Sequence, residues 1–253
     1  LLLGESSIAG VGIDDHQSCI SGQLASELSR LTEKSIDWQV IAKSGYTATE
    51  AAQSLVSTIP EEHFDIIVIG LGGNDTFKVN TPWFWKKAMR NLIKALHKKH
   101  PEACIVINYM PPVHTFIAFS PLIRFFLGNL TKLFGKEMRR LVTEFSYLSY
   151  FDYVVSMNEW IQHSPKRDPK DFFRDGVHPS TVLRRVRKVE ARREDPLLDD
   201  VLTRISQQPH TNQSRKEVCM NAQRQNHSHE TDSETKQDKD MLRVLRRLCE
   251  QNA

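Results

Sequence analysis

The sequence has few cysteines, no long apolar run and little excess charge. No Cys-x-x-Cys pair occurs, which excludes a zinc ribbon and argues against a disulfide framework. No run of about 18 uncharged apolar residues is present, so we expect no transmembrane helix. The formal net charge is only +3, from 34 Lys or Arg and 31 Asp or Glu, so nucleic acid is not an expected partner. The four cysteines are Cys19, Cys104, Cys219 and Cys249.

Two motifs of cofactor chemistry are also missing. The glycines between Gly4 and Gly12 are not followed by Gly-Lys-Ser/Thr, which disfavours a phosphate-binding loop. There is no His-Glu-x-x-His, so we expect neither a catalytic metal nor another cofactor. The chain begins with Leu1 instead of Met, and we interpret it as a fragment whose true start, and any signal peptide, is missing. The compartment stays open, with the cytoplasm as the default expectation.

The composition changes after Ser180. All 11 glycines lie at or before Gly176, and every aromatic residue lies at or before Phe173. Residues 181–253 hold 15 Lys or Arg and 12 Asp or Glu, and such a segment buries too little apolar surface to offset its ordering entropy. We therefore predict a folded domain over residues 1–180 and a charged extension of short helices and disorder over 181–253.

Within residues 1–180, apolar runs alternate with helical patterns. A Thr-Pro pair at 81–82 and a Ser-Pro pair at 120–121 predict helix starts, because Thr and Ser cap helices and proline fits their first position. We expect the second of these helices to be interrupted or bent near Gly128 or Gly135. Alternation predicts an α/β protein, a three-layer α/β/α sandwich with a mostly parallel sheet. The predicted strands are 1–3, 36–42, 65–71, 104–107 and 153–155, and the predicted helices cover 24–31, 49–59, 82–97 and the residues from 121 on.

Polar and glycine residues that are candidates for function follow directly after the predicted strands. They are Ser6, Gly45, residues 72–75 (Gly-Gly-Asn-Asp) and residues 175–179 (Asp-Gly-Val-His-Pro). In open parallel sheets, function gathers at the carboxyl ends of the strands. Taken singly each motif is a weak signal, since a serine after a strand is usually a cap and Gly-Asn-Asp is usually a turn.

Taken in order, the four motifs resemble the four blocks of the SGNH (GDSL-type) hydrolases. Residues 4–10 (Gly-Glu-Ser-Ser-Ile-Ala-Gly) resemble the Gly-Asp-Ser-Leu block, and residues 44–47 (Ser-Gly-Tyr-Thr) resemble the glycine block. Residues 72–75 resemble the Gly-x-Asn-Asp block, and residues 175–179 resemble the Asp-x-x-His block. The resemblance spans residues 1–180 and implies the flavodoxin-like sheet of that family.

The resemblance also implies catalytic roles. Ser6 would be the nucleophile, His178 its general base, and Asp175 the carboxylate that fixes the imidazole tautomer. The oxyanion hole would comprise the backbone N–H groups of Ser6 and Gly45 and the side-chain amide of Asn74. An alternative for Asp175 is that it only caps a following helix.

Three departures from the family pattern are visible. Glu5 stands where the family has Asp, which keeps the charge but lengthens the arm. Ser7 replaces the usual Leu, although Ser6 is the hydroxyl that aligns. After Ser180 the sequence becomes basic and contains no glycine, whereas the family continues into a packed helix that anchors the histidine loop.

The apolar segment 110–127 follows a strand and is a candidate acyl pocket that also touches a lipid surface. Its candidate substrate-binding residues are Val113, Phe116 and Ile117. The alternative is that the segment packs in the core, where buried aromatics usually lie.

The sequence therefore predicts a serine hydrolase of carboxylic esters, esterase or lipase-like, that acts on acyl lipids or small aryl or alkyl esters. Removal of acetyl groups from carbohydrate is the first alternative. A non-catalytic binding domain that kept the hydrolase fold is the second. The expected partner is the ester substrate, with transient lipid-surface contact, and the oligomeric state is left open.

Overall fold

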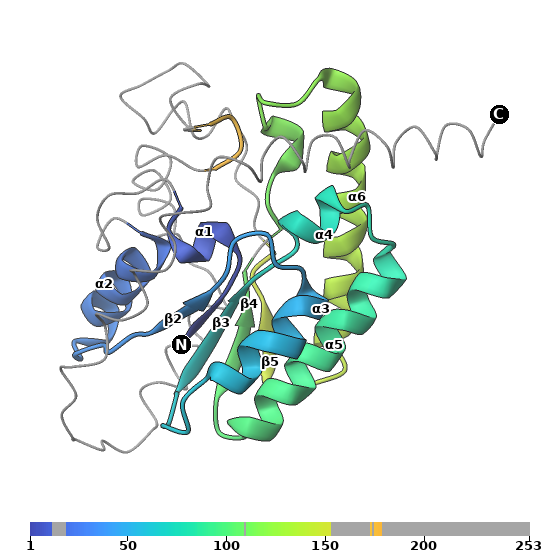
Figure 1. Ribbon diagram of the computed structural model, residues 1–253. Coiled ribbons are helices and arrows are strands. Elements are labelled where there is room, and N and C mark those ends of the chain that lie inside the picture. Colours follow the sequence, from blue (N-terminus) through green and yellow to red (C-terminus); the bar gives the residue numbers. More distant parts are fainter. Residues whose placement is uncertain (12–18, 109, 153–172, 174, 179–253) are drawn as a thin grey trace. The chain divides into compact units, whose positions relative to one another are not determined.

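The computed structural model describes residues 1–11, 19–108, 110–152, 173 and 175–178 (Figure 1). The chain divides into two units, Leu1–Gln207 and Gln208–Ala253, and every described residue belongs to the first. The predicted strand at 153–155 and the predicted extension 181–253 lie outside the described residues, so both stay predictions. Among the described helices, none is long and apolar enough to cross a membrane.

The described sheet has five strands, all parallel, in the order β2-β1-β3-β4-β5. The side chains of Leu3, Ile67, Ile69 and Ile105 are fully buried, as expected of strands covered on both faces. From β1 the chain goes first to β2 on one side and then to β3 on the other, so the order of the strands switches between β1 and β3. Ligands bind at such switch points in open parallel sheets. The strands are β1 (Leu2–Gly4), β2 (Val40–Ala42), β3 (Ile66–Gly70), β4 (Cys104–Ile107) and β5 (Leu148–Tyr150).

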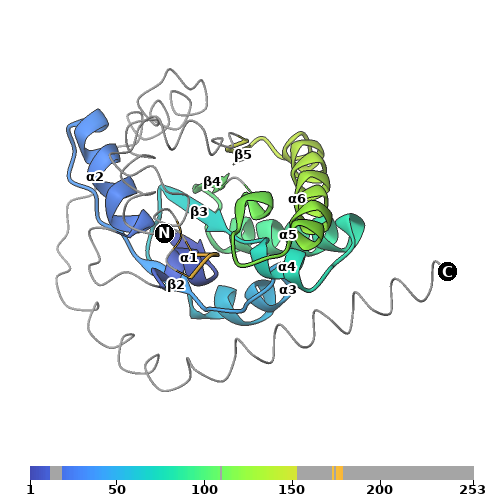
Figure 2. The ribbon, with the colours of Figure 1, turned by 90° about the horizontal axis from the view of Figure 1, so that it is seen from above.

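Helices cover both faces of the sheet, which confirms the predicted three-layer α/β fold (Figures 1 and 2). Helices α3, α5 and α6 lie on one face, and α2 lies on the other. The short helices α1 and α4 follow β1 and β3 directly. The helices are α1 (Ser6–Ala9), α2 (Ile20–Thr32), α3 (Ala48–Glu50), α4 (Gly73–Phe77), α5 (Pro82–Lys99) and α6 (Pro121–Val142), with a π turn at Ala51–Leu55 and 3-10 turns at Val56–Thr58 and Val113–Thr115.

The two long helices begin at the predicted caps. The Thr81 hydroxyl accepts the Phe84 N–H at 3.2 Å, and the Ser120 hydroxyl accepts the Ile123 N–H at 3.5 Å. One contact between the helices is Trp85 stacked on Phe134, with ring centroids 4.6 Å apart. Both rings are fully buried and belong to the main core on this face of the sheet.

Two details differ from the sequence prediction. Helix α6 runs without interruption through Gly128 and Gly135, so the interruption is wrong, and the alternative of a bend stays a prediction. Both glycines serve close packing instead: a Cβ at Gly128 would lie 2.8 Å from His114 Cβ, and one at Gly135 would lie 3.3 Å from the Tyr150 hydroxyl. The fifth described strand is Leu148–Tyr150, which the sequence analysis did not predict.

Candidate active site

Two glycines at the strand ends leave room for the helix that carries Ser6. Gly4 ends β1 and pairs with Gly70, which ends β3, and a Cβ on either residue would collide with the side chain of Ile8. Because neither glycine has a side chain, Ile8 packs directly onto the strand ends and is 1% exposed. Helix α1 therefore starts immediately after the strand, and its first residue, Ser6, lies at the carboxyl edge of the sheet.

The side chains of Ser6, His178 and Asp175 form a continuous chain of polar contacts. The Ser6 Oγ lies 3.0 Å from His178 Nε2, although the two residues are 172 positions apart. On the other side of the ring, His178 Nδ1 lies 2.5 Å from Asp175 Oδ2. An ionised carboxylate can only accept, so Nδ1 carries the proton and Nε2 is left to accept from the serine hydroxyl.

Asp175 is held in its ionised state by the turn in which it lies. Burial opposes the charge, but hydrogen bonds from the His178 ring and from the His178 and Val177 backbone outweigh it and hold the pKa of Asp175 below its ordinary range. Its Oδ1 accepts the backbone N–H groups of Val177 at 2.9 Å and His178 at 2.7 Å. The same carboxylate therefore shapes the turn and orients the imidazole.

The histidine turn is also supported by the segment after β4. Gly176 has φ +84°, and a Cβ there would lie 2.8 Å from both the Cβ and the N of Ala118. The Ala118 N–H donates to the Gly176 carbonyl at 3.3 Å. Phe116 packs edge-on against Phe173, with centroids 5.4 Å apart. These contacts give the turn an anchor that does not depend on residues beyond Ser180.

Gly45 lies on the loop after β2. Its φ is +81°, a conformation that favours glycine, and nothing lies within 4 Å of the position a Cβ would occupy. The loop then enters α3 through a capping box in which Thr47 and Glu50 satisfy each other's backbone N–H groups. The Gly45 N–H is thus carried on a loop whose next turn is firmly fixed.

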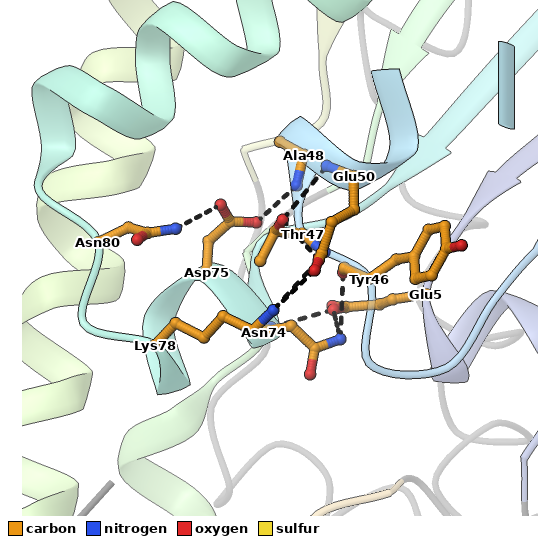
Figure 3. A network of polar contacts seen from close by, with 9 residues as sticks. All are labelled: Glu5, Tyr46, Thr47, Ala48, Glu50, Asn74, Asp75, Lys78 and Asn80. Carbon is orange, nitrogen blue, oxygen red and sulfur yellow. Dashed lines mark hydrogen bonds and ion pairs between the residues drawn. The ribbon is translucent and has the colours of Figure 1, made fainter. Parts of the chain in front are cut away.

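Asn74 lies on α4, directly after β3, and its amide contacts both neighbouring loops (Figure 3). Its Nδ2 donates to Glu5 Oε2 at 2.5 Å and to the Tyr46 carbonyl at 3.2 Å. Glu5 also accepts the backbone N–H groups of Gly73 at 2.9 Å and Asn74 at 3.0 Å. Burial raises the pKa of Glu5 to about 7, although the bonds from Asn74 and Gly73 oppose the rise.

Asp75 ties the same turn to the loop after β2. It is fully buried, and its carboxylate accepts the Ala48 N–H at 2.9 Å and the Asn80 side-chain amide at 3.0 Å. Burial raises the pKa of Asp75 to about 6, against these hydrogen bonds. Figure 3 shows the Asp75 carboxylate bonded to Ala48 and Asn80, and the Glu5 carboxylate bonded to Asn74.

The three candidate substrate residues differ in their placement. Val113 and Phe116 are buried, and only Ile117, which is 38% exposed, presents surface to solvent. Further apolar side chains are exposed on the first turns of α6: Leu122 at 72%, Phe125 at 67% and Phe126 at 53%. The described part of the chain contains no group of three or more His, Cys, Asp or Glu side chains placed to hold a metal ion.

Two features of the site were not anticipated from the sequence. One is the reach of Glu5 to three donors of the α4 turn, and the other is the support that Ala118 and Phe116 give to the histidine turn. The first had a visible signal, because a lengthened carboxylate beside Ser6 and the Gly72-Gly73 pair are both in the sequence. The second had none, since the contacting segments are more than 50 residues apart.

A parallel α/β sheet that carries a serine, a histidine and an asparagine at one edge defines a hydrolase-type architecture. The sequence matches the GDSL-like lipase/acylhydrolase family over residues 2–183, and the chain belongs to this family. No protein of curated function matches the sequence.

Solved structures with the same fold include proteins described as lipolytic G-D-S-L or GDSL-like. A GDSL-like lipase of Parabacteroides merdae, described as putative, matches at TM-score 0.55 and 16% identity, over 81% of this chain and 94% of that one. A lipolytic G-D-S-L protein of Veillonella parvula matches at 0.54 and 13%, over 75% and 93%. Esterase EstA of Pseudoalteromonas sp., inhibited by monoethylphosphonate, matches at 0.53 and 15%, over 75% and 92%. At these identities the likeness is one of fold.

Proposed function

We propose that the protein is a serine hydrolase of carboxylic esters that acts through an acyl-enzyme on Ser6. The observation that carries the proposal is the relay from Asp175 through His178 to Ser6, with contacts of 2.5 Å and 3.0 Å. A neutral hydroxyl is a weak nucleophile, and a base within hydrogen-bond reach activates it.

In the proposed reaction, the Ser6 oxygen attacks the ester carbonyl while His178 Nε2 takes the hydroxyl proton. The tetrahedral intermediate collapses, the C–O bond to the alcohol breaks, and His178 returns the proton to the leaving oxygen. Water then attacks the acyl-enzyme with His178 again as base, which releases the acid and restores Ser6. Asp175 stays ionised throughout and stabilises the imidazolium.

The oxyanion donors in this proposal are the N–H groups of Ser6 and Gly45 and the amide of Asn74. Gly45 favours the assignment because the space beside its Cα is empty, so a substrate oxygen can approach its backbone. The Asn74 amide contacts the Tyr46 carbonyl, next to Gly45, which supports placing the two donors around one oxygen.

The proposed substrates are esters with an apolar acyl group, taken up with transient contact to a lipid or micelle surface. Ile117, Leu122, Phe125 and Phe126 are exposed along the segment whose neighbour Ala118 contacts the histidine turn. Exposed apolar side chains clustered near a site favour an apolar ligand over a sugar. Val113 and Phe116 take a supporting role here, because both are buried.

A hydrolysis profile of p-nitrophenyl esters from acetate to palmitate tests this function. Ser6→Ala should abolish turnover and labelling by a fluorophosphonate, whereas Ser7→Ala, the neighbouring hydroxyl, should keep both. Turnover that survives in Ser6→Ala would remove the mechanism. If the protein neither hydrolyses any of these esters nor takes the label, the result favours the alternative of a non-catalytic binding domain.

The chain-length optimum and the surface contact are tested together. Phe125→Ser with Phe126→Ser should lower activity on micellar palmitate and leave activity on monomeric acetate unchanged, because these side chains lie on the outer face of α6. An optimum at acetate with activity on acetylated sugar would favour the carbohydrate esterase alternative.

A further inference from the structure

One buried carboxylate collects three hydrogen bonds beside the nucleophile. Glu5 is 6% exposed, and its two oxygens accept from the Gly73 N–H, the Asn74 N–H and the Asn74 amide. The carboxylate fits because Gly73 has no side chain: a Cβ there would lie 2.7 Å from Glu5 Oε1. The shorter arm of Asp, the usual residue of the family at this position, has one methylene less to reach the amide.

An amide side chain has a donor end and an acceptor end of nearly equal shape, and something must decide which end faces the substrate. The ionised Glu5 accepts only, so it attracts the Asn74 nitrogen and repels the Asn74 oxygen. One amide hydrogen then points to Glu5, and the other points to the Tyr46 carbonyl at the longer distance of 3.2 Å. Because this bond is the longer and weaker one, an oxyanion beside Gly45 can replace the Tyr46 carbonyl as the acceptor of that hydrogen.

We propose that Glu5 is a positioning residue that fixes the orientation of the Asn74 amide and keeps its second hydrogen directed toward the oxyanion hole. This inference rests on the proposed function. Glu5 stands to Asn74 as Asp175 stands to His178: each carboxylate holds the polar side chain that acts on the substrate. The nucleophile, Ser6, is the next residue after Glu5, so one strand end positions both the attacking oxygen and one oxyanion donor.

The charges around Glu5 decide how this depends on pH. Asp75, on α4, raises the pKa of Glu5 by like-charge repulsion. On the side of β2, Lys43 lies over the Tyr46 ring at 5.0 Å, and beyond Ser6 lies His178. With a pKa of about 7, Glu5 is ionised above neutrality and protonated below it. A protonated Glu5 can donate to the Asn74 oxygen, so the amide loses its preferred orientation as the pH falls.

The test is a double-mutant cycle between Glu5 and Asn74, with kcat and KM measured on p-nitrophenyl butyrate at pH 8. Glu5→Gln should lower kcat about 10²-fold with little change in KM, because a Gln amide can donate to the Asn74 oxygen and reverse the amide. In the Asn74→Ala background the same change should cost less than about threefold. Glu5→Asp keeps the charge and should recover kcat to within about tenfold of the wild type.

A structural role alone would give a different pattern. If Glu5→Gln costs the same in both backgrounds while Ser6-dependent turnover is intact, the inference is wrong and the proposed function stands. If the wild type shows no turnover that Ser6→Ala abolishes, both fail. Should Glu5→Gln not fold, the cycle is run with Glu5→Asp, whose shorter side chain should lower kcat less in the Asn74→Ala background than in the wild type. An equal loss of kcat in both backgrounds overturns the proposal.

Discussion

Glu5 should make the stability of the fold fall as the pH rises toward neutrality. Its pKa is raised from an ordinary 4.5 to about 7, so the folded protein binds the Glu5 proton more tightly than the unfolded chain does. The stabilisation by this proton is complete below about pH 4.5 and is lost as the pH rises through 7. A gap of this size corresponds to about 3 kcal/mol in the free energy of unfolding, at about 1.4 kcal/mol per pKa unit.

The measurement is urea unfolding followed by far-UV circular dichroism at intervals from pH 4.5 to pH 8. Glu5→Gln removes the titrating group, so the difference in unfolding free energy between wild type and variant should change by about 3 kcal/mol across this range. The buried Asp75 contributes a slope of the same sign, with its pKa raised to about 6, but it is present in both proteins. The matched control is Glu61→Gln, at a side chain that is 86% exposed.

Equal pH slopes for the wild type and Glu5→Gln between pH 4.5 and pH 8 would refute the reasoning. They would mean that the three donors around Glu5 stabilise its ionised form as much as burial destabilises it. A slope removed equally by Glu61→Gln would be just as damaging, because it would trace to surface charge.

Three further predictions concern the contacts that position the site. Gly70→Ala should destabilise the fold by about 1–3 kcal/mol in thermal unfolding, because the new methyl group collides with Ile8. The same substitution should cost less when it is made in the Ile8→Ala background, and an equal or larger cost in that background would contradict the packing argument. Gly176→Ala should lower kcat at least about tenfold, because positive φ and contact with Ala118 both displace the histidine turn; wild-type kcat would count against it. Asp175→Asn should lower kcat by about 10³–10⁴-fold at pH 8, since the Asn amide favours the wrong imidazole tautomer, and a loss below tenfold would show that the carboxylate does not orient His178.

The fold class could be predicted from periodicity, and the reasons are local. The buried strands β3 and β4 are continuous apolar runs, and the Thr81-Pro82 and Ser120-Pro121 pairs mark where α5 and α6 begin. The predicted interruption of α6 does not occur, and the reason is non-local, because a glycine inside a helix looks the same in sequence whether it weakens the helix or admits a neighbour. Gly128 admits His114, a contact that belongs to the folded chain.

The candidate site divides in the same way. The motifs at 4–10, 44–47, 72–75 and 175–179 identify residue types that suit ester hydrolysis, and their order matches the family. The expectation that Ser6 and His178 meet came from that family resemblance. The contacts of each carboxylate depend on atoms from other parts of the chain. Glu5 and Asp75 carry the same functional group, but Glu5 accepts from the Asn74 amide and Asp75 accepts from the Ala48 backbone N–H.

The sequence by itself therefore determined the layers, the helix starts and the kinds of side chain available for chemistry, because these depend on neighbours along the chain. Only the tertiary structure decided the Ser6–His178 distance, the contact of Ala118 with Gly176 and the three bonds to Glu5. Each of these joins segments between about 60 and 170 residues apart, and no local pattern specifies which atoms meet once the strands have paired.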